Sequence, residues 1–230
     1  MKKKQLNTQY NGISDTYQEL RRGFNEISDE AFKKLLTLIL EPNLTLSAKK
    51  IIDFACGNGD MIKYFQERGI QCCGVDSSSE MVTLAKQNTG GDIRCEDFAK
   101  TSFESNSFDL VISKWAMQTS ADIDAIYTEA ARLLKSDGHF VFLVVHPFRQ
   151  FLEKKKQGKD YFKKEIVDSI IFDGAITVHE PSHTLKEYLS ETFFKLFTLT
   201  GINEGAEFPA AEQIGGDIYP TYLIITAQKR

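Results

Sequence analysis

The sequence predicts a single α/β domain built on a largely parallel sheet. The chain has 230 residues, enough to bury a substantial core, and predicted strands alternate with predicted helices between about residues 50 and 145. Phe140–Val145 is an unbroken apolar run, as expected for a parallel strand covered on both faces. Ile51 and Ile52 lead through a glycine-bearing turn, Asp53–Asp60, into a helix, which is the βα unit of nucleoside-binding sheets.

The elements are predicted in a regular order. Ser28 can cap a first helix, whose apolar residues form one stripe and which Glu41-Pro42 ends. The spacing of Ser77 and Glu80 is that of a capping box. Helices are predicted over 28–40, 59–68, 78–88 and from Ile123 to Leu134, and strands over about 50–54, 71–75, 92–95, 108–113 and 140–145.

The pattern changes after residue 146. Residues 148–164 are basic and irregular, and residues 165–179 form two β-prone runs around Asp173-Gly174, which indicates a hairpin. Thr184 and Glu187 have capping-box spacing, and apolar residues follow them at helical spacing as far as Leu196. The last two strands are predicted over 199–207 and 221–227.

Composition excludes several classes of protein. The net charge of −4 gives no reason to expect affinity for nucleic acid. No stretch approaches the ~20 apolar residues of a membrane span, and the basic start Met1–Lys4 has no apolar region after it, unlike a signal peptide. The four cysteines lack metal-ligand spacing and are typical of free thiols. We therefore expect a cytoplasmic protein without a metal site and without a nucleic-acid or membrane partner.

Acidic residues gather at one predicted edge of the sheet. Asp53, Asp60, Asp76 and Asp97 all fall at strand ends or helix starts. Asp76 is placed to accept hydrogen bonds from both hydroxyls of a ribose. A dinucleotide would lay its pyrophosphate beside Asp60, which would repel it, and Ile62 occupies the third glycine position of the dinucleotide pattern. An acidic rim instead suits a cofactor that carries a sulfonium and an ammonium, as S-adenosylmethionine does.

The turn Asp53–Asp60 resembles motif I of the class I S-adenosylmethionine-dependent methyltransferases, an acidic residue followed by x-G-x-G-x-G. Gly57 and Gly59 match, while Ala55 stands at the first glycine, a mild change if its φ is negative. The resemblance covers roughly residues 45 to 146. It implies a three-layer α/β/α sandwich with a seven-stranded, mostly parallel sheet and an antiparallel last strand. Further stretches similar to the family are Gly74–Ala85, Cys95–Phe98, Phe108–Ser113 and Leu133–Leu143.

The resemblance also implies S-adenosylmethionine as cofactor, S-adenosylhomocysteine as product, and a set of binding residues. Asp76 would bind the ribose, Asp53 would organise the motif I turn at the methionine end, and Asp97 with Phe98 would contact the adenine. The other cofactor-binding residues expected from it are Tyr17, Ala55, Cys56, Gly57, Ser77, Met81 and Ser113.

The substrate side is expected after the strands at 108–113 and 140–145. The resemblance implies that Lys114, Trp115 and Gln118 turn toward the methyl acceptor. His146 ends a strand at the edge where open α/β sheets bind ligands, which makes it the candidate general base or substrate-orienting residue. Residues 1–27 would cap the cofactor pocket, and residues 147–181 would form a lid insertion.

The sequence therefore predicts methyl transfer from S-adenosylmethionine to a small organic acceptor by in-line displacement. The chain lacks the N/D-P-P-Y/F/W run and the Pro-Cys dipeptide of DNA methyltransferases, which disfavours a nucleic-acid substrate. The oligomeric state is left open. Two other functions also stay open: an NAD(P)-dependent oxidoreductase, which Ile62 and Asp60 disfavour, and a protein that binds S-adenosylmethionine without catalysis.

Overall fold

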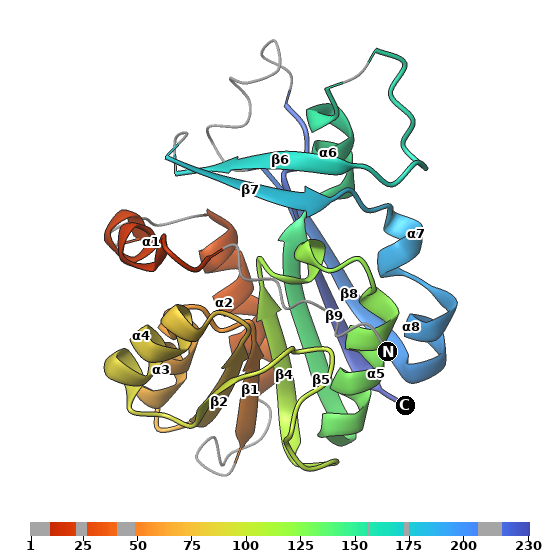
Figure 1. Ribbon diagram of the computed structural model, residues 1–230. Coiled ribbons are helices and arrows are strands. Elements are labelled where there is room, and N and C mark those ends of the chain that lie inside the picture. The colour runs from red at the N-terminus through yellow and green to blue at the C-terminus, as the bar shows by residue number, and fades with distance from the viewer. Residues whose placement is uncertain (1–9, 22–26, 41–48, 156, 173–174, 207–217) are drawn as a thin grey trace, which may run out of the picture.

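A seven-stranded sheet with helices on both faces forms the body of the molecule (Figure 1). The structure is a computed structural model, and it describes residues 10–21, 27–40, 49–155, 157–172, 175–206 and 218–230. The predicted features at Glu41-Pro42, Asp173-Gly174 and residue 207 lie outside these ranges, as do residues 1–9 and 22–26 of the predicted cap. No helix of the described residues is both long and apolar enough to cross a membrane.

The strand order of the sheet is β3-β2-β1-β4-β5-β9-β8. β9 is antiparallel to both of its neighbours, and the other pairs are parallel, which confirms the predicted mostly parallel sheet with an antiparallel last strand. The order reverses between β1 and β4, so a crevice is expected above their carboxyl ends. The strands are β1 Lys50–Phe54, β2 Gln71–Asp76, β3 Ile93–Cys95, β4 Phe108–Lys114, β5 Leu134–Val145, β8 Phe197–Gly205 and β9 Tyr222–Lys229.

Apolar residues alternate between the two faces of the sheet. Ile51 packs with α2 (Ile27–Leu40), α3 (Asp60–Gln66) and α4 (Ser79–Thr89). Ile52 packs on the opposite face with α5 (Ile123–Leu133) and α8 (Glu191–Leu196), so the molecule has three layers. β1 is buried from Ile51 to Phe54, as expected for a parallel strand covered on both faces.

An aromatic cluster fills the α5 side of the sheet. The Tyr127 ring lies 5.3 Å from that of Phe193 and 6.2 Å from that of Phe140, centroid to centroid. Its hydroxyl donates a hydrogen bond to the carbonyl of Tyr188 at 2.7 Å. Tyr188 ends the short helix α7 (Leu185–Tyr188), so this bond fixes the segment after the sheet insertion onto α5.

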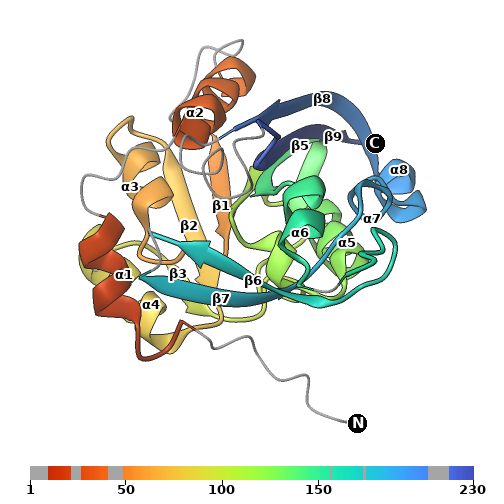
Figure 2. The same ribbon diagram turned by 90° about the horizontal axis from the view of Figure 1, so that it is seen from above.

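A separate two-stranded hairpin, formed by β6 (Ile166–Ile171) and β7 (Ile176–Pro181), lies over the carboxyl ends of the parallel strands (Figures 1 and 2). We call that side of the sheet the carboxyl edge. The prediction that residues 148–164 are irregular is wrong at the start of that segment, where α6 (Pro147–Glu153) forms. This helix begins there because His146 caps it and Pro147 occupies its first turn. The helical spacing of residues 185–196 gives two short helices, since Ser190 caps α8 anew.

The two tyrosines on the α5 side provide a matched test of packing. We expect Tyr127→Phe to lower the free energy of unfolding by about 1–2 kcal/mol, because it leaves the buried Tyr188 carbonyl without its donor. Tyr188→Phe should change it by less than about 0.5 kcal/mol or raise it, because the buried Tyr188 hydroxyl makes no hydrogen bond to the described residues. Urea denaturation followed by circular dichroism measures both, and equal losses would contradict this account.

Candidate active site

The turn after β1 is a tight loop with three left-handed residues. Ala55, Gly57 and Gly59 have φ of 57°, 53° and 87°. The Cys56 amide donates to the carbonyl of Val75 at 2.9 Å, and the Gly59 amide donates to the carbonyl of Cys56 at 3.0 Å. Ala55 therefore keeps the backbone conformation of a glycine at the cost of steric strain, and its substitution is not the mild change that a negative φ would have made it.

Two glycines allow close approaches around this turn. A Cβ at Gly57 would meet no protein atom within 4 Å, so the backbone there is bare toward the neighbouring pocket. A Cβ at Gly74 on β2 would lie 2.7 Å from the sulfur of Cys56 and 2.8 Å from Cδ1 of Ile62. Glycine at position 74 therefore lets the turn and α3 pack directly on β2.

Asp76 connects the turns that follow β1 and β2. One carboxylate oxygen accepts a hydrogen bond from the Gly57 amide at 2.9 Å, and the other accepts one from the Ser78 amide at 2.8 Å. Burial raises the pKa of Asp76, and these backbone donors oppose the rise. Each oxygen of an ionised carboxylate has a second lone pair, so Asp76 can still accept hydrogen bonds from a ligand.

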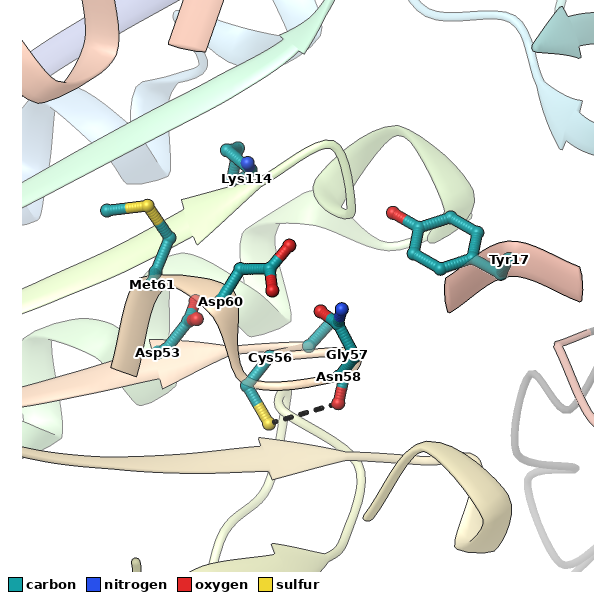
Figure 3. Close-up of a pocket in the computed structure, with 9 residues that line it drawn as sticks. Tyr17, Asp53, Cys56, Gly57, Asn58, Asp60, Met61 and Lys114 are labelled. Atoms are coloured by element: carbon teal, nitrogen blue, oxygen red, sulfur yellow. Dashed lines mark hydrogen bonds between the residues drawn. The ribbon is translucent and has the colours of Figure 1, made fainter. Parts of the chain in front are cut away.

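A pocket opens beside this turn, between the carboxyl ends of β1 and β4 (Figure 3). Asp53 lies at its base and is only 3% exposed. Burial raises the pKa of Asp53 to about 8; the neighbouring carboxylates of Asp76 and Asp60 add to the rise, and Lys114 opposes it. The pocket is lined by Tyr17, Asp53, Ala55, Cys56, Gly57, Asn58, Asp60, Met61 and Lys114.

Lys114 reaches the pocket from the end of β4. Its ammonium is bonded to the carboxylate of Asp29 on α2 at 2.8 Å, and both side chains are largely buried. The pocket is therefore acidic even with this cation counted, because Lys114 already has an acidic partner outside the lining residues.

The N-terminal segment covers the site from the α4 side. The Gly12 amide and the Ser14 hydroxyl both donate to the same Glu80 oxygen, at 2.7 and 2.9 Å. These bonds fix α1 (Ser14–Arg21) at the start of α4, where Tyr17 faces the turn at residues 55–59 across the pocket. The Tyr17 ring contacts that of Phe172, at the end of β6, with centroids 5.4 Å apart, so α1 and the hairpin meet above the pocket (Figure 2).

The structure brings together five of the predicted cofactor-binding residues and places the others further along the same edge. Asp97 is half-buried and accepts a hydrogen bond from the Ala99 amide at 2.9 Å, while Phe98 packs on Phe54. The five around the pocket are Tyr17, Asp53, Ala55, Cys56 and Gly57. The others follow β2, β3 and β4 in the sequence or end them: Asp76, Ser77, Met81, Asp97, Phe98 and Ser113.

Some residues are held in ways that the sequence did not indicate. Met81 is buried, and its amide is bonded to the Ser78 hydroxyl. Ser113 is buried too, and its hydroxyl donates to the carbonyl of Phe54 at 3.3 Å. Asn58 and Met61 line the pocket although neither was predicted to bind ligand. Their only signal was a position in the turn and in the first turn of α3, beside Asp60.

The predicted substrate residues differ in what they can do. Trp115 is half-buried and packs against the apolar cluster on the α2 side. Gln118 is buried, and no residue of the described chain bonds to its Oε1. Nδ1 of His146 accepts from the Phe148 amide at 3.0 Å, so Nε2 donates to Glu204 at 2.7 Å. His146 caps α6 and has no free lone pair, so this arrangement gives no support to a general-base role.

Known proteins share this architecture and sequence pattern. Residues 52–142 match the family model described as "Methyltransferase domain". A ubiquinone/menaquinone biosynthesis C-methyltransferase from Campylobacter jejuni is 28% identical over 187 residues, 74% of this chain and 75% of the relative. A demethylmenaquinone methyltransferase from Thermotoga maritima is 28% identical over 142 residues, 60% of each chain.

Two solved structures show the same fold. An S-adenosylmethionine-dependent methyltransferase from Mesorhizobium loti superposes with a TM-score of 0.66 at 22% identity, over 85% of this chain and 96% of the other. A geranyl diphosphate C-methyltransferase from Streptomyces coelicolor, in complex with S-adenosylhomocysteine, superposes with a TM-score of 0.62 at 15% identity, over 87% and 76%.

The sheet order, the turn after β1 and the acidic pocket at the point of strand reversal are arranged as in nucleoside-binding α/β proteins. The family match covers residues 52–142, and along most of its length the chain is similar to methyltransferases, one of them named as S-adenosylmethionine-dependent. The described residues fit the cofactor of this family. Asp53 and Asp60 supply negative charge for a sulfonium and an ammonium, and Asp76 retains acceptor sites for ribose hydroxyls.

Asp53 makes the stability of the ligand-free protein depend on pH. Its folded pKa of about 8 exceeds the ordinary value of 3.8, so the folded state holds an extra proton in that window, and the free energy of unfolding falls as pH rises through it. We expect Asp53→Asn to raise the melting temperature at about pH 8 and to have little effect near pH 4. Thermal denaturation across this range measures the difference.

Asp109 is the matched control for Asp53. Burial alone would raise the pKa of Asp109, but Lys135 and the Lys50 amide hold that pKa below its ordinary value. Asp109→Asn should therefore lower the melting temperature at about pH 8. This decrease should become smaller as the pH falls through the range in which carboxyl groups ordinarily titrate. Parallel pH dependence of the two variants would contradict the charges assigned to them.

The strain at Ala55 can be relieved. We expect Ala55→Gly to raise the free energy of unfolding by about 0.5–1 kcal/mol, because the left-handed penalty of ~1–2 kcal/mol exceeds the cost of a more flexible unfolded chain. Gly74→Ala should lower it by about 1–3 kcal/mol, since its Cβ has no room beside Cys56. Chemical denaturation compares the two, and a destabilising Ala55→Gly would refute the strain.

Proposed function

We propose that this methyltransferase acts on a small organic acceptor by in-line displacement. The observation that carries the proposal is the acidic pocket beside Gly57, which lies where the strand order reverses and is covered by α1 and the hairpin. The acidic lining of this pocket suits the positively charged end of a cofactor. The net charge of −4 gives no electrostatic attraction for nucleic acid.

Four of the predicted cofactor-binding residues, together with Asp60, have roles in this proposal. Bound S-adenosylmethionine supplies a methyl group on a positively charged sulfur, already activated for transfer. Asp76 holds the ribose, Asp53 and Asp60 face the positive end, and Asp97 with Phe98 borders the adenine. The protein's main contribution is orientation of donor and acceptor, which can account for about 7–11 kcal/mol of a barrier.

Residues 147–181 form the lid of the acceptor site in this proposal, and residues 1–27 form the cap of the cofactor site. Support comes from the hairpin lying over the carboxyl edge and from the ring contact between Tyr17 and Phe172. Exclusion of water by such a cover strengthens electrostatic interactions with the ligands. The four free cysteines support a cytoplasmic location.

A narrower candidate is methylation of carbon on a quinone-type ring. It is supported by the two relatives whose names state quinone substrates, and by the structural neighbour that methylates carbon of geranyl diphosphate. A methyl-release assay with 1,4-dihydroxynaphthalene, simple phenols, amines, thiols and transfer RNA tests both proposals. We expect turnover with small molecules alone, and turnover with transfer RNA alone would overturn the proposed acceptor class.

The ribose assignment is tested by binding. We expect Asp76→Asn to weaken the affinity for S-adenosylhomocysteine by about 10- to 100-fold, because one charge-assisted acceptor is lost at about 1.5–3 kcal/mol. Asp92→Asn is the control, since Asp92 is exposed and bonded to Arg94 at the start of β3. Titration calorimetry measures both dissociation constants on variants that melt like the wild type, and an unchanged value for Asp76→Asn removes the assignment.

A further inference from the structure

A carboxylate occupies an apolar position in the hairpin. Along β7, Ile176, Val178 and Glu180 are buried, while Thr177 and His179 between them are exposed. The inward face of β7 thus reads apolar, apolar, acidic. Glu180 is only 1% exposed, and carboxylates are almost never buried so completely without a specific reason.

A chain of hydrogen bonds fixes this carboxylate. One oxygen of Glu180 accepts from the Ser169 hydroxyl at 2.7 Å and from the Gln150 side-chain amide at 2.9 Å. The other end of the Gln150 amide accepts from the His183 backbone at 2.8 Å, and Nε2 of His183 donates to the Gln118 carbonyl at 3.0 Å. All five residues are buried, so the network joins β6, β7 and α6 to the segment after β4.

Glu180 lies near the carboxyl edge of the sheet. The Tyr10 hydroxyl lies within electrostatic range of both Glu180 and Asp76; its pKa is raised first by burial, then by Tyr17 and by these two carboxylates. β7 packs on the 3₁₀ turn Met117–Thr119, which follows β4 at the carboxyl edge. Glu180 therefore lies on the buried face of the hairpin, beside this turn.

The surroundings make this carboxylate a base near neutral pH. Burial raises the pKa of Glu180 to about 7, with Ser169 and Gln150 opposing the rise. The charged groups that face it from α6 are Glu153, which raises the pKa further, and Arg149, which lowers it and is itself bonded to Glu153 at 2.8 Å. From the other elements it is faced by the neutral phenols of Tyr10 and Tyr188. A pKa near the working pH is the optimum for a general base.

We propose that Glu180 takes the proton of the methyl acceptor, and that the acceptor carries a phenol-type hydroxyl. This rests on the proposed function. The O–H bond of the acceptor breaks, its proton forms an O–H bond on Glu180, and the electron pair stays on the acceptor. That pair forms the bond to the methyl carbon, at oxygen or at a conjugated ring carbon, while the carbon–sulfur pair stays on sulfur. With carbon as the nucleophile, the ring proton then leaves to water, and Glu180 returns its proton to the oxygen, which restores the hydroxyl.

Gln118 adds a second point of recognition. Its Oε1 is buried and receives no hydrogen bond from the described residues, although its backbone carbonyl anchors the Glu180 network through His183. A buried acceptor without a donor favours a ligand that supplies one.

The activity test uses acceptors that differ in acidity. With 1,4-dihydroxynaphthalene under reducing conditions, we expect Glu180→Gln to lower kcat by about 100-fold or more, with an unchanged Kd for S-adenosylhomocysteine. Wild-type activity should rise with pH around a midpoint near 7, and the variant should lose this dependence. With 4-nitrophenol, which is ionised at about pH 9, the loss should be much smaller because no proton needs to be removed.

Two further variants separate proton transfer from a structural role. Glu180→Asp keeps a carboxylate and should fall between wild type and Glu180→Gln, whereas a purely structural residue would tolerate the isosteric amide better. Asp168→Asn makes the same chemical change on the outer face of the hairpin, where Asp168 is bonded to His179, and should leave kcat unchanged. Wild-type activity in Glu180→Gln, or equal losses with both phenols, would overturn the proposal.

A measurement without acceptor completes the test. Carbon-13 NMR of side-chain-labelled glutamate, in the complex with S-adenosylhomocysteine, should show one carboxyl resonance that is absent in Glu180→Gln and titrates near 7. A midpoint at the ordinary glutamate value would overturn the role of Glu180. If wild type methylates no phenol, the proposed acceptor fails, and this titration still decides whether Glu180 can act as a base.

Discussion

Two buried carboxylates at the ends of β1 and β2 are the constraint on which the rest of the site depends. Asp76 accepts from the Gly57 and Ser78 amides, so the same side chain that is suited to bind ribose also closes two turns. Asp53 has no comparable set of backbone donors among the described residues, and burial raises its pKa strongly. The ionised form of Asp53 is therefore unfavourable in this fold until a cation binds beside it. Binding sites commonly lower the stability of a protein in this way.

The arrangement of the sheet explains why such a destabilising carboxylate is tolerated at the carboxyl edge. The aromatic cluster around Tyr127 and the apolar residues of α2, α3 and α4 bury both faces, so stability comes from the body of the sheet. The carboxyl edge contributes less to this apolar packing. There, α1 is fixed through Glu80, and the hairpin is fixed through Gln150 and His183, each by polar contacts.

Local sequence signals predicted most helices and strands, but they could not predict contacts between residues that are far apart in the chain. The bounds of β1 and the capping box at Thr184 were predicted correctly, because apolar runs and caps are local. The bond between His146 and Glu204 joins residues far apart in the chain, so the sequence could not show that this histidine is occupied. The alternation in 165–179 predicted a hairpin but not which face is buried, and Glu180 therefore passed unnoticed.

The charge balance of methyl transfer relates the two carboxyls whose pKa values are raised, those of Asp53 and Glu180. Methyl transfer to a neutral acceptor removes a positive charge from sulfur and releases a proton. In a site shielded from water, an uncompensated charge is costly, so the loss of the sulfonium charge is best matched by the loss of a negative charge in the same site. If the proton stays on Glu180 during transfer, the total charge of the cleft is unchanged at that step. Asp53 on the cofactor side and Glu180 on the hairpin side then serve opposite needs, one ionising against a cation and the other accepting a proton.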